Sequence, residues 1–157
     1  HNSKKTMTTP AEIKLLAEER LEEAEILCNN GKYVGAFYLA GYSIELMLKA
    51  RICEVFGVPG LFDPSDTTMQ SEGISELKRM VKTHNLRLLL TVGGLRVKFQ
   101  ADATTNENLF LAKSLLIEKW SEQCRYERQG YVTPTEVIDS ITLLTATNGL
   151  LQWINNN

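Results

Sequence analysis

The pattern of hydrophobic and polar residues predicts helices along most of the chain. Thr9-Pro10-Ala11-Glu12 has the residue types of a capping box with proline at the first helical position, so a helix is predicted to begin there. Asn29-Asn30-Gly31 is predicted to end it. Between them the apolar residues recur on one helical face and glutamates cover much of the rest, which is the amphipathic period. The apolar face consists of Ile13, Leu16, Ala17, Leu21, Ala24, Leu27 and Cys28.

The second predicted helix, residues 32–56, is apolar on nearly every face, so we expect neighbours on several sides. Its central run, AFYLAGYSIELMLKA, nevertheless carries Glu45 and Lys49 at helical spacing. Burying Glu45 without a partner would cost several kcal/mol, so a cation must satisfy it. The sequence leaves two candidates open: Lys49, which would form a local structural pair, and Arg125 from a later segment.

The rest of the chain also favours helices. Residues 133–153 begin with a second capping pattern, Thr133-Pro134-Thr135-Glu136, and LRVKF within 95–105 fits a short strand. The other segments are a predicted loop at 57–71, a helix over 72–92 that breaks or bends near Thr83-His84-Asn85, and a helix over 106–123. The fold class predicted is all-α, an up-and-down bundle of four to five helices.

Composition is typical of one ordinary domain, here residues 9–157. Residues 1–8 are predicted to be a flexible tail or, in part, a cloning remnant. The uncharged stretch from Tyr33 to Ile44 has 12 residues, too short for the roughly 20 that span a bilayer, so we expect a soluble protein without membrane contact. Cys28, Cys53 and Cys124 are odd in number and widely spaced, which argues against disulfides and zinc and favours a cytoplasmic location.

Charge is nearly balanced overall but uneven along the chain. The net charge is −2, which gives no general attraction to DNA or anionic lipid. Residues 77–101 contain no acid, however, and surround His84 with bases: Lys78, Arg79, Lys82, Arg87, Arg96 and Lys98. Two interpretations stay open. The segment attracts phosphate, or it packs beside the glutamate-rich first helix and its charges pair there.

Candidate chemistry rests on few residues. The chain has no phosphate-binding glycine loop, nucleophile elbow or zinc-binding helix motif, and we expect no cofactor and no metal. Arg79 precedes His84 in an R-x4-H pattern, which suits an imidazole that takes a ribose 2′-OH proton beside a guanidinium that steadies phosphate. The same pattern also fits a histidine bonded to backbone and a solvated arginine, and this structural interpretation is the more common one for so short a pattern. Arg125 beside Tyr126 suits phosphate binding and base stacking, or a structural cap.

Three segments together resemble the HEPN domain, a small helical domain often encoded beside a minimal nucleotidyltransferase. They are GKYVGAFYLAGYSIELMLKA at 31–50, THNLRLLL at 83–90 and CRY at 124–126. His84 matches the histidine that precedes the family's leucine pair, and Arg125 with Tyr126 matches its late arginine–tyrosine pair. Glu45 and Lys49 match its central helix, while Asn85 stands where many members have aspartate.

The resemblance implies a helical bundle, commonly a homodimer, that binds a nucleotide or RNA. The residues implied for this are His84, Arg125 and Tyr126, and Arg87 of the basic segment is a further candidate for binding the phosphate. It also implies a nucleotidyltransferase partner, in a toxin–antitoxin or defence system. Some HEPN families are metal-independent RNases with an R-x4–6-H motif, so an alternative is an RNase toxin in which His84 acts with Arg79 or Arg125. A second alternative is a non-catalytic helical scaffold.

A homodimer is also suggested by the last predicted helix. Three large apolar side chains lie near the C-terminus, namely Leu150, Leu151 and Trp153. Together they present more apolar surface than we expect one small bundle to cover. We therefore expect these side chains to be exposed in a single copy of the chain.

Overall fold

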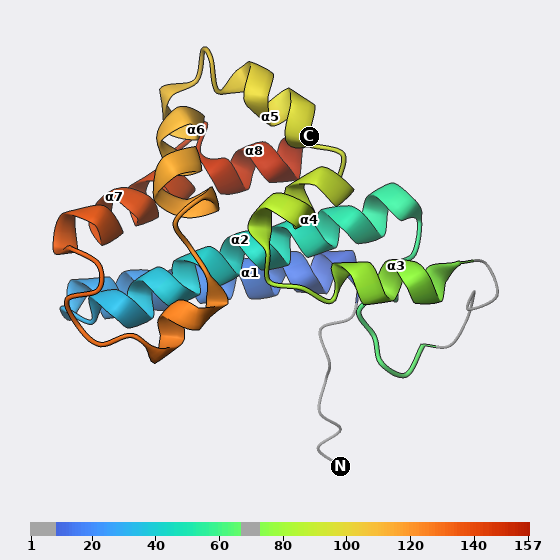
Figure 1. Cartoon of the computed structure of the whole chain (residues 1–157), viewed down its shortest axis with the longest axis horizontal. Helices are drawn as coiled ribbons and strands as arrows, with labels where there is room; N and C mark the ends of the chain where they lie inside the picture. Colours follow the sequence, from blue (N-terminus) through green and yellow to red (C-terminus); the bar gives the residue numbers. More distant parts are fainter. Residues whose placement is uncertain (1–8, 67–72) are drawn as a thin grey trace.

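The computed structural model describes residues 9–66 and 73–157, and these residues form helices and connecting turns without any strand (Figure 1). The predicted tail at 1–8 and part of the predicted loop, 67–72, lie outside the described residues. The elements are α1 Pro10–Asn29, α2 Tyr33–Phe56, α3 Ile74–Val81, α4 Leu86–Val92, α5 Arg96–Asp102, α6 Glu107–Ala112, the π-helical turn η2 Lys113–Ile117, the 3₁₀ turn η3 Glu122–Tyr126, α7 Pro134–Thr145 and α8 Leu150–Asn156. The all-α prediction is confirmed.

The two long helices, α1 and α2, run antiparallel along the long axis of the molecule (Figure 1). Thr9 caps α1 by accepting a hydrogen bond from the Glu12 amide at 3.3 Å, and Pro10 occupies the first turn. The predicted start is confirmed, although within the described part of the chain the Glu12 carboxylate does not accept the reciprocal bond from the Thr9 amide. At α7 the capping box is complete in both directions. Gly31, at φ 74°, turns the chain into α2, as predicted.

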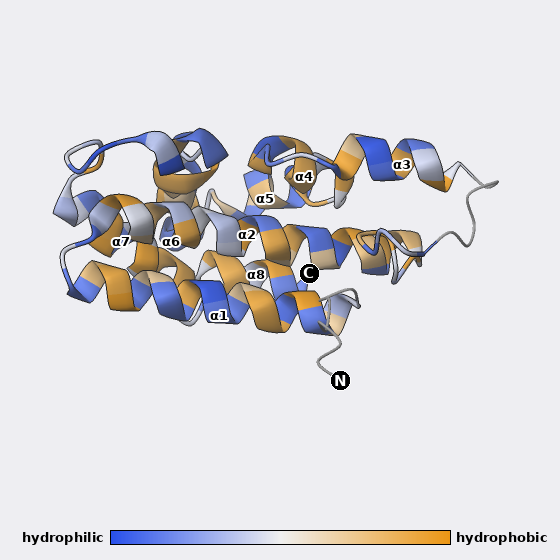
Figure 2. Cartoon of the chain, turned by 90° about the horizontal axis from the view of Figure 1, so that it is seen from below, coloured by the Kyte–Doolittle hydropathy of each residue, from blue (hydrophilic) through white to orange (hydrophobic). Residues whose placement is uncertain are grey.

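Helix α2 is the centre of the molecule. It lies between α1 on one side and α3 and α4 on the other, and α7, α8 and η3 also contact it (Figure 2). Buried residues therefore occur on all of its faces, which confirms the prediction of neighbours on several sides. Gly57, at φ 66°, ends the helix in the left-handed conformation that glycine adopts readily.

The predicted helix over 72–92 is broken, as expected, into α3 and α4, with residues 82–85 between them. Asn85 caps α4 by accepting a hydrogen bond from the Leu88 amide at 3.1 Å. The strand suggested by LRVKF is wrong, because these residues enter α5 and bury Phe99 against Trp153 of α8. The helix predicted for 106–123 is shorter than expected, since the π-helical turn η2 ends it.

The last predicted helix is two helices, because the chain leaves helical geometry at Ala146 and turns through Asn148, at φ 47°. A Cβ atom at Gly149 would overlap the Leu143 and Ala146 carbonyls, so only glycine fits this turn. The turn folds α8 back onto the bundle and buries Leu150, Leu151 and Trp153. The expectation that these side chains are exposed is wrong, and the homodimer that it supported stays a prediction. Nowhere in the described ranges is a helix both long and apolar enough for a membrane span.

The segment after η2 is held against α2 by Trp120. Its indole N–H donates to the carbonyl of Tyr38 at 3.2 Å, and its ring stacks on Tyr38 with centroids 6.3 Å apart. The indole lies directly over Gly41, where any Cβ atom would overlap it. This contact needs a glycine in the middle of a long helix, a position where glycine otherwise lowers stability.

We predict that Gly41→Ala lowers the free energy of unfolding by about 1–3 kcal/mol, because the added methyl displaces Trp120. The matched control is Gly35→Ala in the same helix, where the nearest atom is the mobile end of Leu27 at 3.3 Å. That substitution should leave stability unchanged or raise it by up to about 1 kcal/mol through helix propensity. Urea denaturation measures both, and a similar change in both variants would contradict the Trp120 contact.

Candidate functional site

Glu45 is the buried charge at the centre of the candidate site. Its side chain is 2% exposed, and each carboxylate oxygen has a separate basic partner. Lys49 of the same helix lies 3.1 Å from Oε2, and the Nδ1 atom of His84 lies 2.7 Å from Oε1. Lys49 also lies over the Phe62 ring, 5.3 Å from its centroid. Of the two partners considered from the sequence, Lys49 is therefore present, and the second partner is His84, not Arg125.

The cap of α4 positions His84. Because Asn85 is the N-cap residue, His84 is the last residue before the helix, and the break between α3 and α4 brings it over α2. Aspartate caps helices in the same way as asparagine, so Asn85 fills the structural role that aspartate would have. With Nδ1 bonded to Glu45, the Nε2 atom faces outward, where it lies 3.5 Å from Oε2 of Glu122.

Glu122 connects His84 to Arg125. The same Oε2 atom that faces His84 lies 3.5 Å from Nη1 of Arg125. Arg125 in turn donates to the Tyr126 hydroxyl at 2.9 Å, and its guanidinium lies 4.8 Å from the centroid of that ring. Hydrogen bonds to Tyr126 and Tyr38 raise the pKa of Arg125, which keeps it charged. Lys49, Glu45, His84, Glu122 and Arg125 thus form one continuous chain of charged or ionisable side chains.

A polar groove of about 560 Å³ opens beside His84. The linker before α4 and the first residues of α4 form one wall, and the segment from Ile117 to Gln123 forms the other. Two basic side chains, Lys82 and Arg87, and two acidic ones, Glu118 and Glu122, line it. The groove is therefore mixed in charge, and Arg87 of the basic segment lies in it with His84.

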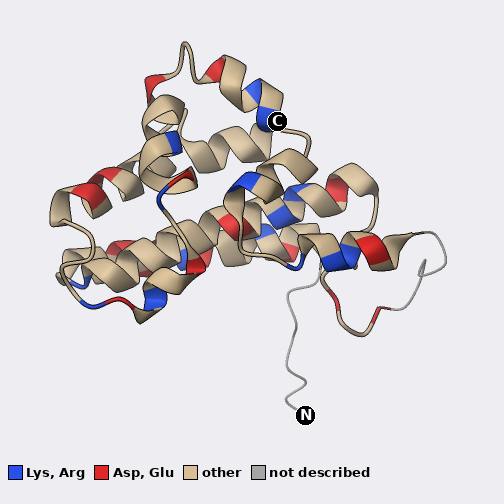
Figure 3. Cartoon of the chain, in the orientation of Figure 1, with Lys and Arg blue, Asp and Glu red and all other residues tan. Residues whose placement is uncertain are grey.

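The basic segment 77–101 does not pair with the acidic first helix. Lysine and arginine residues occur along α3, α4 and α5 (Figure 3), and α1 lies on the opposite side of α2 from α3 and α4 (Figure 2). The ion pairs of α1 join Lys14 to Glu54 and Arg20 to Glu23. No ion pair between described residues joins α1 to this segment. The interpretation in which the two charge clusters neutralise each other is wrong.

Arg79 lies apart from His84. It is an exposed residue of α3 and lines another hollow, of about 480 Å³, together with residues of the loop after α2. Within the described chain no hydrogen bond or ion pair joins Arg79 to His84. The R-x4-H spacing consequently does not place the two side chains in contact, whereas Arg125, far away in sequence, is linked to His84 through Glu122.

Sequence reasoning missed Glu122 and the contact between Glu45 and His84. Glu122 is one of several glutamates without a motif around it, and only the packing of Trp120 on Gly41 brings η3 beside His84. The signal available for the contact between Glu45 and His84 was a glutamate predicted to be buried in a chain that has a histidine elsewhere. His84 was considered only as a base or ligand, not as the partner of Glu45.

Among the described residues of this site, we find neither an ionised thiol nor a cluster of metal-ligating side chains. Cys124 lies in the same 3₁₀ turn as Glu122, but it is buried, and burial raises its pKa to about 11. A thiol with that pKa is protonated at neutral pH and is a poor nucleophile. Across 9–66 and 73–157, no three histidine, cysteine, aspartate or glutamate residues cluster closely enough to hold a metal ion.

Comparison of the chain with known protein families, with curated proteins and with solved structures finds no match.

Replacing Glu45 tests whether its charge holds this site together. We expect Glu45→Gln to lower the free energy of unfolding by about 3 kcal/mol, because Lys49 would remain largely buried without its counter-charge. Glu54→Gln is the matched control on the same helix, since Glu54 is 46% exposed in its pair with Lys14 and its loss should cost less than about 1 kcal/mol. Urea denaturation of both variants decides the question, and equal losses would contradict the buried role of Glu45.

Proposed function

We propose that this chain is a HEPN-type module that binds a nucleotide or RNA in the groove beside His84. The three segments that carry the resemblance are far apart in sequence, and each supplies one member of the same charge chain: Glu45, His84 and Arg125. A homodimer and a nucleotidyltransferase partner in a toxin–antitoxin or defence system are proposed from the resemblance alone.

The contact between Glu45 and His84 is the observation that carries the proposal. A buried carboxylate is costly, and Lys49 bonds only its Oε2 atom. The Oε1 atom instead holds an exposed imidazole at the edge of a polar groove. The carboxylate fixes the ring orientation through Nδ1 and leaves Nε2 directed at the groove. An imidazole held in this way is suited to contact a phosphate or a ribose hydroxyl.

Glu122 marks the position where we expect the ligand phosphate. One of its oxygens lies 3.5 Å from both the His84 imidazole and the Arg125 guanidinium, so these two groups already converge on one anion. Both distances exceed the 2.7–2.9 Å of a strong charge-assisted hydrogen bond. A phosphate oxygen can therefore replace the Glu122 carboxylate between them, while Arg87 and Lys82 line the groove beyond.

We predict that AMP or ADP binds saturably and that Arg125→Ala and His84→Ala each weaken this binding about tenfold or more, because each removes a charge-assisted contact. Arg128→Ala is the control, since Arg128 is exposed three residues away from Arg125 and its side chain has no partner among the described residues. Isothermal titration calorimetry measures the affinities. If neither nucleotide produces heat or a shift in melting temperature, the chain is better described as a helical scaffold.

A second function is favoured by the same contact, because a carboxylate that orients an imidazole is the arrangement of a general base. In a metal-independent RNase, Nε2 of His84 would take the proton of the ribose 2′-OH. The 2′-oxygen would then attack the phosphorus and expel the 5′-oxygen, which takes a proton from water and leaves as a 5′-hydroxyl, and the other product is a 2′,3′-cyclic phosphate. Arg125 is better situated than Arg79 to stabilise the developing charge, since it shares the anion position with His84.

RNA cleavage in the presence of EDTA tests this second function. Activity should yield a cyclic phosphate, disappear in His84→Ala and fall at least about a hundredfold in Arg125→Ala, as for other groups that stabilise transition-state charge. Arg79→Ala should keep activity within about twofold, because Arg79 lines a different hollow. Cleavage that survives His84→Ala would rule out His84 as the base.

A further inference from the structure

The groove beside His84 is one end of a longer furrow. A hollow of about 150 Å³ shares three lining residues with it, namely Arg87, Ile117 and Glu118. This hollow shares Gln100 and Lys113 with a third one of about 490 Å³. Residues of α4 and α5 form one wall of the furrow, and α6 and η2 contribute the other. The π-helical turn η2 lies along its middle, and such turns are frequent at functional sites.

Unpaired cations follow the furrow. The side chains of Lys82, Arg87 and Arg96 line it in this order, and none of them has an ion pair or hydrogen bond with another described residue. Lys113, farther along, makes a long contact of 3.9 Å with Glu118 and has no other side-chain partner among residues 9–66 and 73–157. Cations without internal partners are available to an external polyanion, and their order along one furrow suits an extended one.

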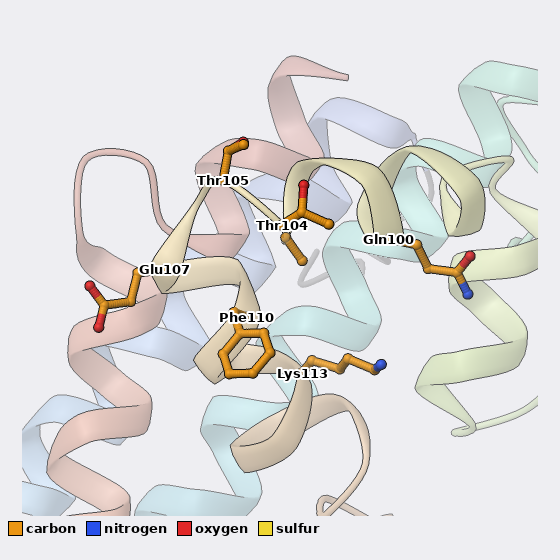
Figure 4. Close-up of a pocket in the computed structure, with 7 residues that line it drawn as sticks. Gln100, Thr104, Thr105, Glu107, Phe110 and Lys113 are labelled. Atoms are coloured by element: carbon orange, nitrogen blue, oxygen red, sulfur yellow. The ribbon is translucent and has the colours of Figure 1, made fainter.

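An exposed aromatic ring lies at the far end. Phe110 is 62% exposed in the third hollow, where Figure 4 shows its ring beside the Lys113 side chain, across from Gln100 of α5. The Glu107 carboxylate points away from Lys113 in the same view. A ring of this size is usually buried, and an exposed ring beside a cation offers a surface on which an unpaired base can stack.

We infer that this furrow is a second subsite, which holds the backbone phosphates of single-stranded RNA on Arg87 and Arg96 and one unpaired base on Phe110. The inference rests on the proposed function, because it extends the ligand of the His84 groove from a mononucleotide to a single strand. Duplex RNA cannot use this subsite fully, since its bases are already stacked on each other. A mononucleotide in the His84 groove does not reach Phe110, which lines a different hollow.

Fluorescence anisotropy tests the inference. The probe is a single-stranded RNA of about eight nucleotides, a length within the range that single-strand binding grooves cover. The wild-type chain should bind this probe at least about tenfold more tightly than AMP, which is measured by competition. Phe110→Ala should weaken RNA binding about tenfold, the effect of one lost stacking contact, and leave AMP binding unchanged. Arg96→Gln should also weaken it and should lower the slope of log affinity against log salt by about 0.7.

Matched controls separate the furrow from general surface charge. Lys98→Gln removes a cation from the same helix as Arg96, but Lys98 pairs with Asp102 at 3.3 Å and lines none of the three hollows. Phe56→Ala removes another exposed phenylalanine, 46% exposed at the end of α2. Neither control should change RNA binding. All four side chains are exposed, so melting temperatures should stay close to that of the wild type.

The outcomes distinguish the two proposals. The RNA subsite is contradicted if AMP binds at the His84 groove and the RNA probe binds no more tightly than AMP. It is also contradicted if Phe110→Ala and Arg96→Gln bind RNA as their control variants do. In both cases the proposed function stands. Equal binding of a duplex of the same length also overturns the RNA subsite. If the wild-type chain binds neither AMP nor RNA, the proposed function fails and the furrow with it. A furrow that serves a protein partner instead would give this last result.

Discussion

A carboxylate buried in the most central helix governs the arrangement of this protein. Glu45 is almost inaccessible to water, so its two oxygens must be satisfied from within the fold. Lys49 satisfies one of them locally, four residues along the same helix. His84 satisfies the other from 39 residues away, and this bond ties the linker between α3 and α4 to α2. The same contact that stabilises the bundle therefore sets the orientation of the one imidazole at the groove.

A second constraint, steric in origin, completes the site. Gly41 lets the Trp120 indole lie flat on α2, and the hydrogen bond from Trp120 to the Tyr38 carbonyl fixes the chain just before η3. Glu122 and Arg125 follow within a few residues and are thereby brought to the outer face of His84. Because α1 occupies the other side of α2, its glutamates cannot neutralise the basic residues along α4 and α5. Arg87 and Arg96 are left lining the furrow.

Local features of the structure were readable from the sequence. Both threonine caps, the break at Thr83-His84-Asn85 and the end of α1 at Asn29 follow from residues that lie within one helical turn of each other. The failures share one cause. The alternating pattern of LRVKF fits a short strand, but packing of Phe99 against Trp153 favours a helix, and that contact joins residues more than fifty positions apart. The turn at Asn148 was missed because the apolar period continues on both sides of it.

The candidate site shows the same division. The sequence by itself determined that a buried helix carries Glu45 and Lys49. It also determined that basic residues without acids surround His84 and that Arg125 lies beside a tyrosine. These are local properties, because they depend only on residue identity and short spacing. Only the tertiary structure decided that His84 is the second partner of Glu45, that Glu122 joins it to Arg125, and that Arg79 faces another hollow. Partners far apart in sequence are chosen by how helices pack, and packing depends on close fits such as that of Trp120 over Gly41, which no local pattern encodes.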